Sequence, residues 1–107
     1  MNIDKIINNN PNIKTIGIVG GGQLGRMMCF SAHKMGFKTV IFSDQDQCVA
    51  SFVTNNIIIA NYDDWDALDK FAEIVDIVTF EFENIPFATI NYLSNRVNTY
   101  PNAQILK

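Results

Sequence analysis

The sequence predicts an α/β fold in which a doubly wound parallel sheet lies between two layers of helices, giving three layers in all. Two observations carry this prediction. Predicted strands and helices alternate along the chain, and nearly every predicted strand is a continuous apolar run. Alternation is typical of a parallel sheet, and continuous apolar strands are typical of a sheet that is covered on both faces.

Five short segments rich in β-branched and aromatic residues are the predicted strands. They cover residues 15–19, 38–42, 56–60, 76–82 and 97–99, and an Asn-rich leader, residues 1–12, precedes them. Most of these segments end at glycine, proline or polar residues, as strands commonly do. The folded domain is therefore predicted to cover residues 13–101.

Three helices are predicted from apolar residues spaced i, i+3, i+4. The first begins at Gln23 and is closed by Gly36. Its predicted inward stripe is Leu24, Met27, Met28, Ser31, Ala32 and Met35. The second is capped by Asp63 or Asp64. Its predicted inward face is Trp65, Leu68, Phe71 and Ala72. Pro86 opens the third, which extends to about residue 93.

Composition and charge exclude several classes of protein. The chain has 107 residues, of which 48% are hydrophobic and 18% charged, enough for one small globular domain. Its net charge of -3 gives no long-range attraction to nucleic acid or to an anionic membrane. No apolar run approaches the roughly 18 residues that span a bilayer, and the leader lacks the apolar core of a secretory signal.

Cysteine and histidine are too sparse to suggest a metal site or a nucleophilic catalytic arrangement. Cys29, Cys48 and His33 show no spacing typical of metal ligands. The cysteines are predicted to be reduced thiols of a cytoplasmic protein, because disulfides are rare in that compartment. His33 falls on the first predicted helix and is predicted to face solvent.

A glycine-rich loop joins the first predicted strand to the first predicted helix. Residues 20–25 read G-x-G-x-x-G, a pattern that is weak alone but here has the required strand–loop–helix context. Gly20 permits a sharp turn, Gly22 lets a ligand approach the backbone, and Gly25 lets helix and strand pack closely. The first backbone N–H groups of the helix, near Gln23 and Leu24, are expected to bind a phosphate. The alternative is a purely structural turn.

A dinucleotide is the usual ligand of such a loop in a Rossmann-like fold. Dinucleotide binding requires an acidic residue at the end of the second strand, where it holds the ribose hydroxyls. Ser43 occupies that position here, and Asp44 comes one residue later, on the opposite side of a strand. An NAD(P)-binding domain of an oxidoreductase therefore remains as a weakened alternative.

Two carboxylates close the fourth predicted strand. Glu81 and Glu83 follow an otherwise apolar run, and buried carboxylates are costly unless they are paired. In a sheet of order 3-2-1-4, strands one and four are neighbours, and ligands bind where their carboxyl ends meet. Glu81 is therefore predicted to face Gly22 across one pocket, fitting a sugar phosphate that carries an amine or hydroxyl. Glu83, later at the strand exit, is more simply a solvated or capping carboxylate.

Three segments resemble the N5-carboxyaminoimidazole ribonucleotide synthetase family: residues 16–28, the Tyr-Asp-Asp at 62–64, and residues 78–86. The resemblance covers essentially residues 13–101. It implies a pre-ATP-grasp domain, which helps to hold the ribonucleotide, followed after a linker beginning at 102–107 by an ATP-grasp domain that binds ATP and Mg²⁺. Gln23 before Leu24-Gly25, with Glu83 in the later motif, looks more like this family than like biotin carboxylase or the formate-dependent glycinamide ribonucleotide transformylase.

The resemblance implies an ATP-dependent carboxylation in de novo purine biosynthesis by an enzyme classed as a ligase, or as a carboxylase or lyase. ATP and bicarbonate would form carboxyphosphate, and the exocyclic amine of 5-aminoimidazole ribonucleotide would capture the CO2 equivalent. Gly22, Gln23 and Leu24 would meet the 5′-phosphate or ribose. Glu81 would orient the amine, with Arg26 and Glu83 as supporting residues. No catalytic residue is expected in these 107 residues.

The chain departs from the family pattern in two places and in length. The usual Asp-Pro after the second strand is Ser43-Asp44, and Val49 stands where a proline usually follows the cysteine. Alone, the chain is expected to be inactive and to bind neither ATP nor Mg²⁺. Family members are often homodimers. A second alternative is a free-standing or degenerate binding domain.

Overall fold

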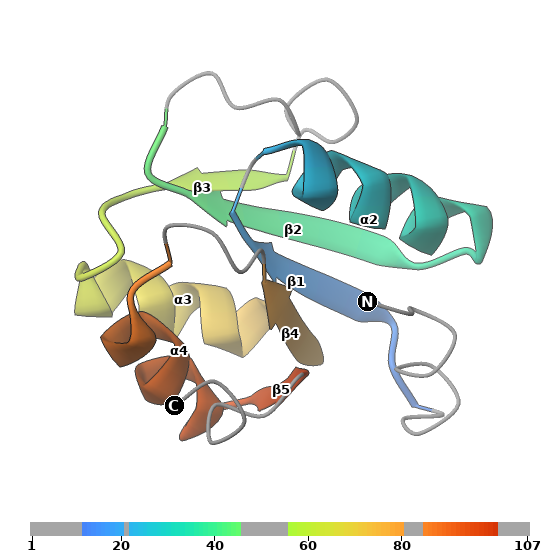
Figure 1. Cartoon of the computed structure of the whole chain (residues 1–107). Coiled ribbons are helices and arrows are strands. Elements are labelled where there is room, and N and C mark those ends of the chain that lie inside the picture. The colour runs from blue at the N-terminus through green and yellow to red at the C-terminus, as the bar shows by residue number, and fades with distance from the viewer. Residues whose placement is uncertain (1–11, 21, 46–55, 81–84, 101–107) are drawn as a thin grey trace.

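The computed structural model describes residues 12–20, 22–45, 56–80 and 85–100, with only the backbone described at Gln23 and Leu24. Strands and helices alternate along the described chain (Figure 1), except between β2 and β3, where residues 46–55 lie outside the described residues. The elements are β1 Thr15–Val19, α2 Gln23–Lys34, β2 Lys38–Ser43, β3 Ile57–Ile59, α3 Trp65–Ile74, β4 Ile77–Phe80, α4 Phe87–Ser94 and β5 Asn98–Tyr100.

The strands form one parallel sheet of order β3-β2-β1-β4-β5. Figure 1 shows α2 on one face and α3 and α4 on the other. The doubly wound, three-layer, Rossmann-like prediction is therefore confirmed. The first strand has the predicted bounds, β2 is one residue longer, and β3 is shorter at both ends. β5 lies one residue later than predicted, and residues 81–82 of the fourth predicted strand lie outside the described residues.

Two apolar clusters cover the two faces of the sheet. The cluster under α2 contains Ile13, Ile16, Ile18, Met28, Cys29, Ala32, Ile41 and Ile77. The cluster under α3 and α4 contains Val19, Val40, Phe42, Leu68, Phe71, Val75, Val78, Phe80, Ile90 and Leu93. Successive residues of a strand point to opposite faces, which is why Ile18 and Val19 belong to different clusters. Burial on both faces explains the continuous apolar strands.

The buried face of α2 is narrower than predicted. Met28 and Ala32 are buried, as expected, but Met27 is 62% exposed, Met35 is 46% exposed and Ser31 is exposed. The prediction was wrong for these three residues. The residues that face the sheet include Cys29 with Ala32, which are small and let the helix lie close to the strands. The two methionines fall on the outer flanks of that stripe.

The end of α2 is a Schellman motif, as the position of Gly36 predicts. Gly36 has a φ of 85°, and its N–H donates to the carbonyl of His33 at 3.0 Å. The N–H of Phe37 donates to the carbonyl of Ala32, also at 3.0 Å. These two bonds satisfy carbonyl groups that a helix end leaves unpaired.

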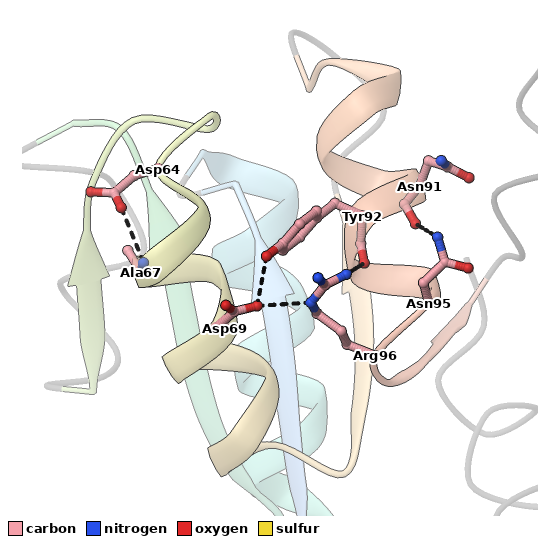
Figure 2. Close-up of polar contacts among 7 residues, drawn as sticks. All are labelled: Asp64, Ala67, Asp69, Asn91, Tyr92, Asn95 and Arg96. Carbon is pink, nitrogen blue, oxygen red and sulfur yellow. Dashed lines mark hydrogen bonds and ion pairs between the residues drawn. The ribbon is translucent and has the colours of Figure 1, made fainter.

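The start of α3 confirms Asp64 as its cap, since the Asp64 Oδ1 accepts a hydrogen bond from the N–H of Ala67 at 3.1 Å (Figure 2). Leu68 and Phe71 are fully buried, as predicted. Trp65 is 41% exposed, so its inward placement was wrong. Its ring lies 4.6 Å from the ring of Tyr92, and it therefore packs on the surface between α3 and α4.

A polar network joins α3 to the end of α4 (Figure 2). One carboxylate oxygen of Asp69 accepts hydrogen bonds from the Tyr92 hydroxyl at 2.8 Å and from the Arg96 Nε at 2.7 Å. The Arg96 guanidinium also lies 3.4 Å from the centre of the Tyr92 ring. The hydrogen bond to Asp69 raises the pKa of the Tyr92 phenol above its ordinary value. The network links the two helices on their solvent side.

Asp76 fastens the start of β1 to the start of β4. Its carboxylate accepts hydrogen bonds from the N–H groups of Lys14 and Thr15, each at 2.9 Å, and these lower the pKa of Asp76 below the ordinary 3.8. A lowered folded-state pKa contributes stability that is present above the unfolded-state pKa and lost as the pH falls through the folded-state value.

Asp76→Ala is therefore expected to lower the free energy of unfolding by about 1 kcal/mol at pH 7, since the group is exposed to solvent. Urea denaturation at pH 7 and at steps below pH 4 measures the difference between variant and parent, which should shrink as the pH falls. A difference that stays constant down to pH 3 would contradict the role of the charge. Asp76→Asn, which keeps an acceptor oxygen, is the matched control and should lose less.

Candidate functional site

The carboxyl ends of β1, β2 and β4 meet at one edge of the sheet. Val19, the last residue of β1, is in register with Phe42 of β2 on one side and with Phe80, the last residue of β4, on the other. The chain leaves β1 for β2 and leaves β4 for β5, so the connections diverge here to opposite sides of the sheet. A divergence of this kind is where doubly wound sheets bind ligands.

The chain turns sharply at the end of β1. Gly20 has a φ of 108°, a backbone conformation that residues with a Cβ rarely adopt. Its N–H donates to the carbonyl of Phe42 at 2.8 Å, which ties the turn to β2. Gly20 therefore has the turn-forming role that the sequence predicts for it.

The first turn of α2 opens toward this edge without a side-chain cap. Gly22 is the N-cap residue, and its carbonyl accepts a hydrogen bond from the N–H of Arg26 at 3.0 Å. The first turn contains no acidic residue. The first N–H groups of a helix have no partner within it, and the helix dipole is positive at this end. The backbone at Gln23 and Leu24 is thus suited to an anion such as a phosphate.

The structure places some of the predicted site residues and not others. Gly20 and Gly22 lie at the carboxyl edge, which is the edge of the sheet where β1, β2 and β4 end. Gly25 is buried in α2. Arg26 is half-buried, and its guanidinium lies 5.7 Å from the centre of the Phe30 ring on the same helix. Glu81 and Glu83 lie outside the described residues. Their roles, and the binding roles of the loop residues, stay predictions.

The end of β2 bears on the dinucleotide alternative. Ser43 is the last residue of β2 and is 2% exposed, and its hydroxyl oxygen accepts a hydrogen bond from the N–H of Gln45 at 3.2 Å. Asp44 is exposed. The strand therefore ends in a hydroxyl that is engaged in a local turn, at the position where a dinucleotide-binding domain would have a carboxylate.

Cysteine, histidine and acidic side chains do not gather into a metal site in the part of the chain that is described. The Cys29 side chain is buried, and Cys48 lies outside the described residues. His33 is exposed, as predicted, and its Nε2 lies 2.8 Å from the Thr39 hydroxyl. None of the described helices has the length and apolar character needed to cross a membrane.

Two contacts that connect α4 to β2 through Tyr62 were not predicted from the sequence. The Thr89 hydroxyl, on α4, donates to the carbonyl of Tyr62 at 2.6 Å. The Tyr62 ring lies 6.1 Å from the Phe42 ring. Tyr62 belongs to one of the family-like motifs, a signal that could have drawn attention to it. Thr89 carries no comparable signal, because its partner is 27 residues away.

A family model for the ribonucleotide synthetase preATP-grasp domain matches residues 13–107. The chain belongs to this family. The match favours the predicted pre-ATP-grasp domain over the dinucleotide-binding alternative. The preATP-grasp assignment agrees with the sheet order and with the glycine turn at the end of β1.

Relatives and solved structures agree with the family. A bifunctional purine synthesis protein, purC/E, of Dictyostelium discoideum is 45% identical over 97 residues, which are 91% of this chain and 10% of that protein. N5-carboxyaminoimidazole synthetase from Staphylococcus aureus aligns with a TM-score of 0.81 and 40% identity over 88% of this chain and 26% of its own. N5-carboxyaminoimidazole synthase from Aspergillus clavatus, in complex with ADP and 5-aminoimidazole ribonucleotide, aligns with a TM-score of 0.73 and 25% identity over 87% of this chain and 25% of its own. The chain spans about a quarter or less of the length of these relatives.

Proposed function

We propose that this chain is the ribonucleotide-binding domain of an ATP-dependent enzyme that carboxylates 5-aminoimidazole ribonucleotide in de novo purine biosynthesis. One observation of the structure supports this proposal above the others. The positive-φ turn at Gly20 and the first turn of α2, whose N-cap is Gly22, lie at the carboxyl end of β1, directly beside the carboxyl end of β4. The ribonucleotide in the Aspergillus clavatus complex supports the choice of substrate.

The proposed role of each residue follows from the chemistry of the substrate. The backbone at Gly22, Gln23 and Leu24 would bind the 5′-phosphate, because a helix N-terminus stabilises a dianion without a cationic side chain. Glu81 directly follows Phe80, the register partner of Val19, and would accept a hydrogen bond from the exocyclic amine. Arg26 and Glu83 would act as supporting charges.

The reaction balances as a ligation. A bicarbonate oxygen attacks the γ-phosphorus of ATP and ADP leaves, which gives carboxyphosphate. The amine nitrogen forms a bond to the carboxyl carbon, phosphate leaves, and the amine loses a proton, which gives N5-carboxyaminoimidazole ribonucleotide. The domain's contribution is orientation, since holding two reactants in place lowers the entropic barrier of a bimolecular step.

ATP and Mg²⁺ are assigned to the part of the enzyme that follows this domain in the family. The described residues offer no convergent set of acidic, histidine or cysteine ligands for a metal ion, so no step of the nucleotide chemistry is assigned to them. We further expect the enzyme to be cytoplasmic and to form a homodimer, as family members often do.

Titration of the chain with 5-aminoimidazole ribonucleotide, or with ribose 5-phosphate as a mimic, is expected to shift the backbone amide signals of residues 22–25 in NMR spectra. Ribose without phosphate is the matched control and should leave these signals in place. Shifts confined to other parts of the chain would contradict the site. NADH is the third ligand to be tested, and saturable binding of NADH with no response to the sugar phosphate would favour the dinucleotide alternative.

A further inference from the structure

The glycine turn is connected to the start of α4 through two other parts of the fold. The Gly20 N–H is held by the carbonyl of Phe42, the Phe42 ring packs on the Tyr62 ring, and the Tyr62 carbonyl is held by the Thr89 hydroxyl. Each step is a hydrogen bond or a ring contact within the normal range for such pairs. Residues outside the glycine loop therefore form a chain of contacts with the carboxyl edge.

Phe42 and Thr89, which both contact Tyr62, are buried, and burial restricts their side chains to one packed arrangement. Phe42 is fully buried, and its ring also lies 5.5 Å from the ring of Phe71. Thr89 is 1% exposed, so the hydroxyl that donates to the Tyr62 carbonyl is shielded from water, and Thr89→Val would remove this hydrogen bond. Phe42 therefore contributes both the carbonyl that accepts the hydrogen bond of the Gly20 turn and a ring that packs against Tyr62.

We propose that Thr89 and Tyr62 are positioning residues that hold the Gly20 turn in the conformation in which the start of α2 accepts a phosphate. What the turn binds rests on the proposed function; the dependence of its conformation on Thr89 does not. The alternative is that Thr89 only stabilises the fold as a whole. The two differ in whether the loss of the hydroxyl acts locally at the turn or uniformly over the sheet.

Amide hydrogen exchange of the ligand-free chain separates these two cases. Thr89→Val removes the hydroxyl and keeps the shape, and it is expected to speed exchange at the Gly20 amide about three- to tenfold more than at the Lys38 amide. The Lys38 N–H donates to the carbonyl of Lys14 at the opposite edge of the sheet, so it reports opening far from the Gly20 turn. Equal acceleration at both amides, or none at Gly20, would overturn the proposal.

Two variants control for the substitution itself. Thr89→Ser keeps the hydroxyl and should restore slow exchange at Gly20. Ser94→Ala removes another hydroxyl from α4, one that donates to the carbonyl of Asn91 at 2.9 Å near the end of the helix, and it should leave Gly20 unchanged. If Thr89→Val does not fold, Tyr62→Leu provides the same test, because it removes the ring contact with Phe42 and keeps the backbone carbonyl.

Ribose 5-phosphate binding then provides a second readout. If the parent chain binds it, Thr89→Val should bind about three- to tenfold more weakly and Thr89→Ser as the parent does. Unchanged affinity in Thr89→Val would count against the proposal. A parent chain that binds no sugar phosphate would count against the proposed function instead, and the exchange result alone would then decide the role of Thr89.

Discussion

Glu81→Gln, introduced into a longer enzyme that carries this domain, is expected to lower kcat/KM for 5-aminoimidazole ribonucleotide about 10- to 100-fold. A hydrogen bond to a charged acceptor contributes about 1.5–3 kcal/mol, and the glutamine keeps the shape of the side chain while removing the charge. Release of ADP that depends on the ribonucleotide measures the effect. The KM for ATP should change little, since ATP is expected to bind to another part of the enzyme.

Glu83→Gln is the matched control, because it changes the same type of residue two positions later in the same segment. It is expected to change kcat/KM by less than about threefold, because the sequence places Glu83 later at the strand exit, where a supporting charge contributes less than a direct contact. Equal losses in the two variants would show that the two carboxylates act together or that Glu83 is the one in contact. Full activity in both would remove the β4 side of the pocket from the proposal.

Gly17→Ala is expected to lower the free energy of unfolding by about 1–3 kcal/mol, the usual cost of overpacking a core. A Cβ on Gly17 would lie 2.6 Å from Cζ of Phe71 and 3.0 Å from Cγ1 of Val75, closer than atoms in a folded core normally approach. Phe71 is fully buried and has little room to withdraw. Thermal and urea unfolding followed by circular dichroism would measure the loss.

A double-mutant cycle tests the cause of that loss. In a Phe71→Leu background the added methyl group meets a smaller side chain, so the cost of Gly17→Ala should fall. The same cost in both backgrounds would rule out the Phe71 contact as its origin. Gly36→Ala is a useful comparison: its chain neighbours aside, no atom of the described residues lies within 4 Å of its added Cβ, and its φ of 85° is what opposes the substitution.

The features of the fold that depend on local chemistry were predictable from the sequence. Apolar runs predicted the strands, the pair Asp63 and Asp64 predicted the start of α3, and Gly36 predicted the end of α2, because caps and strand burial depend on residues close in sequence. The faces of the helices were harder to predict. Met27, Met35 and Trp65 are apolar but exposed, because the width of a buried face depends on how closely a helix approaches the sheet.

The candidate site was predictable on the side formed by one continuous segment. The turn at Gly20 and the start of α2 after Gly22 follow from the glycine pattern and its position after a strand. The hydrogen bond between Thr89 and Tyr62 joins two segments whose proximity only the folded sheet creates, so no local pattern could indicate it. The contribution of Glu81 remains a prediction, because that residue lies outside the described part of the chain.

The stacking of Trp65 on Tyr92 gives the molecule a built-in optical probe. Trp65 is the one tryptophan of the sequence, so all indole fluorescence originates where α3 begins against α4. Its emission would therefore follow the separation of these two helices during unfolding without any attached dye. A change in the same emission on ligand addition would show that binding at the carboxyl edge alters the packing of α3 against α4.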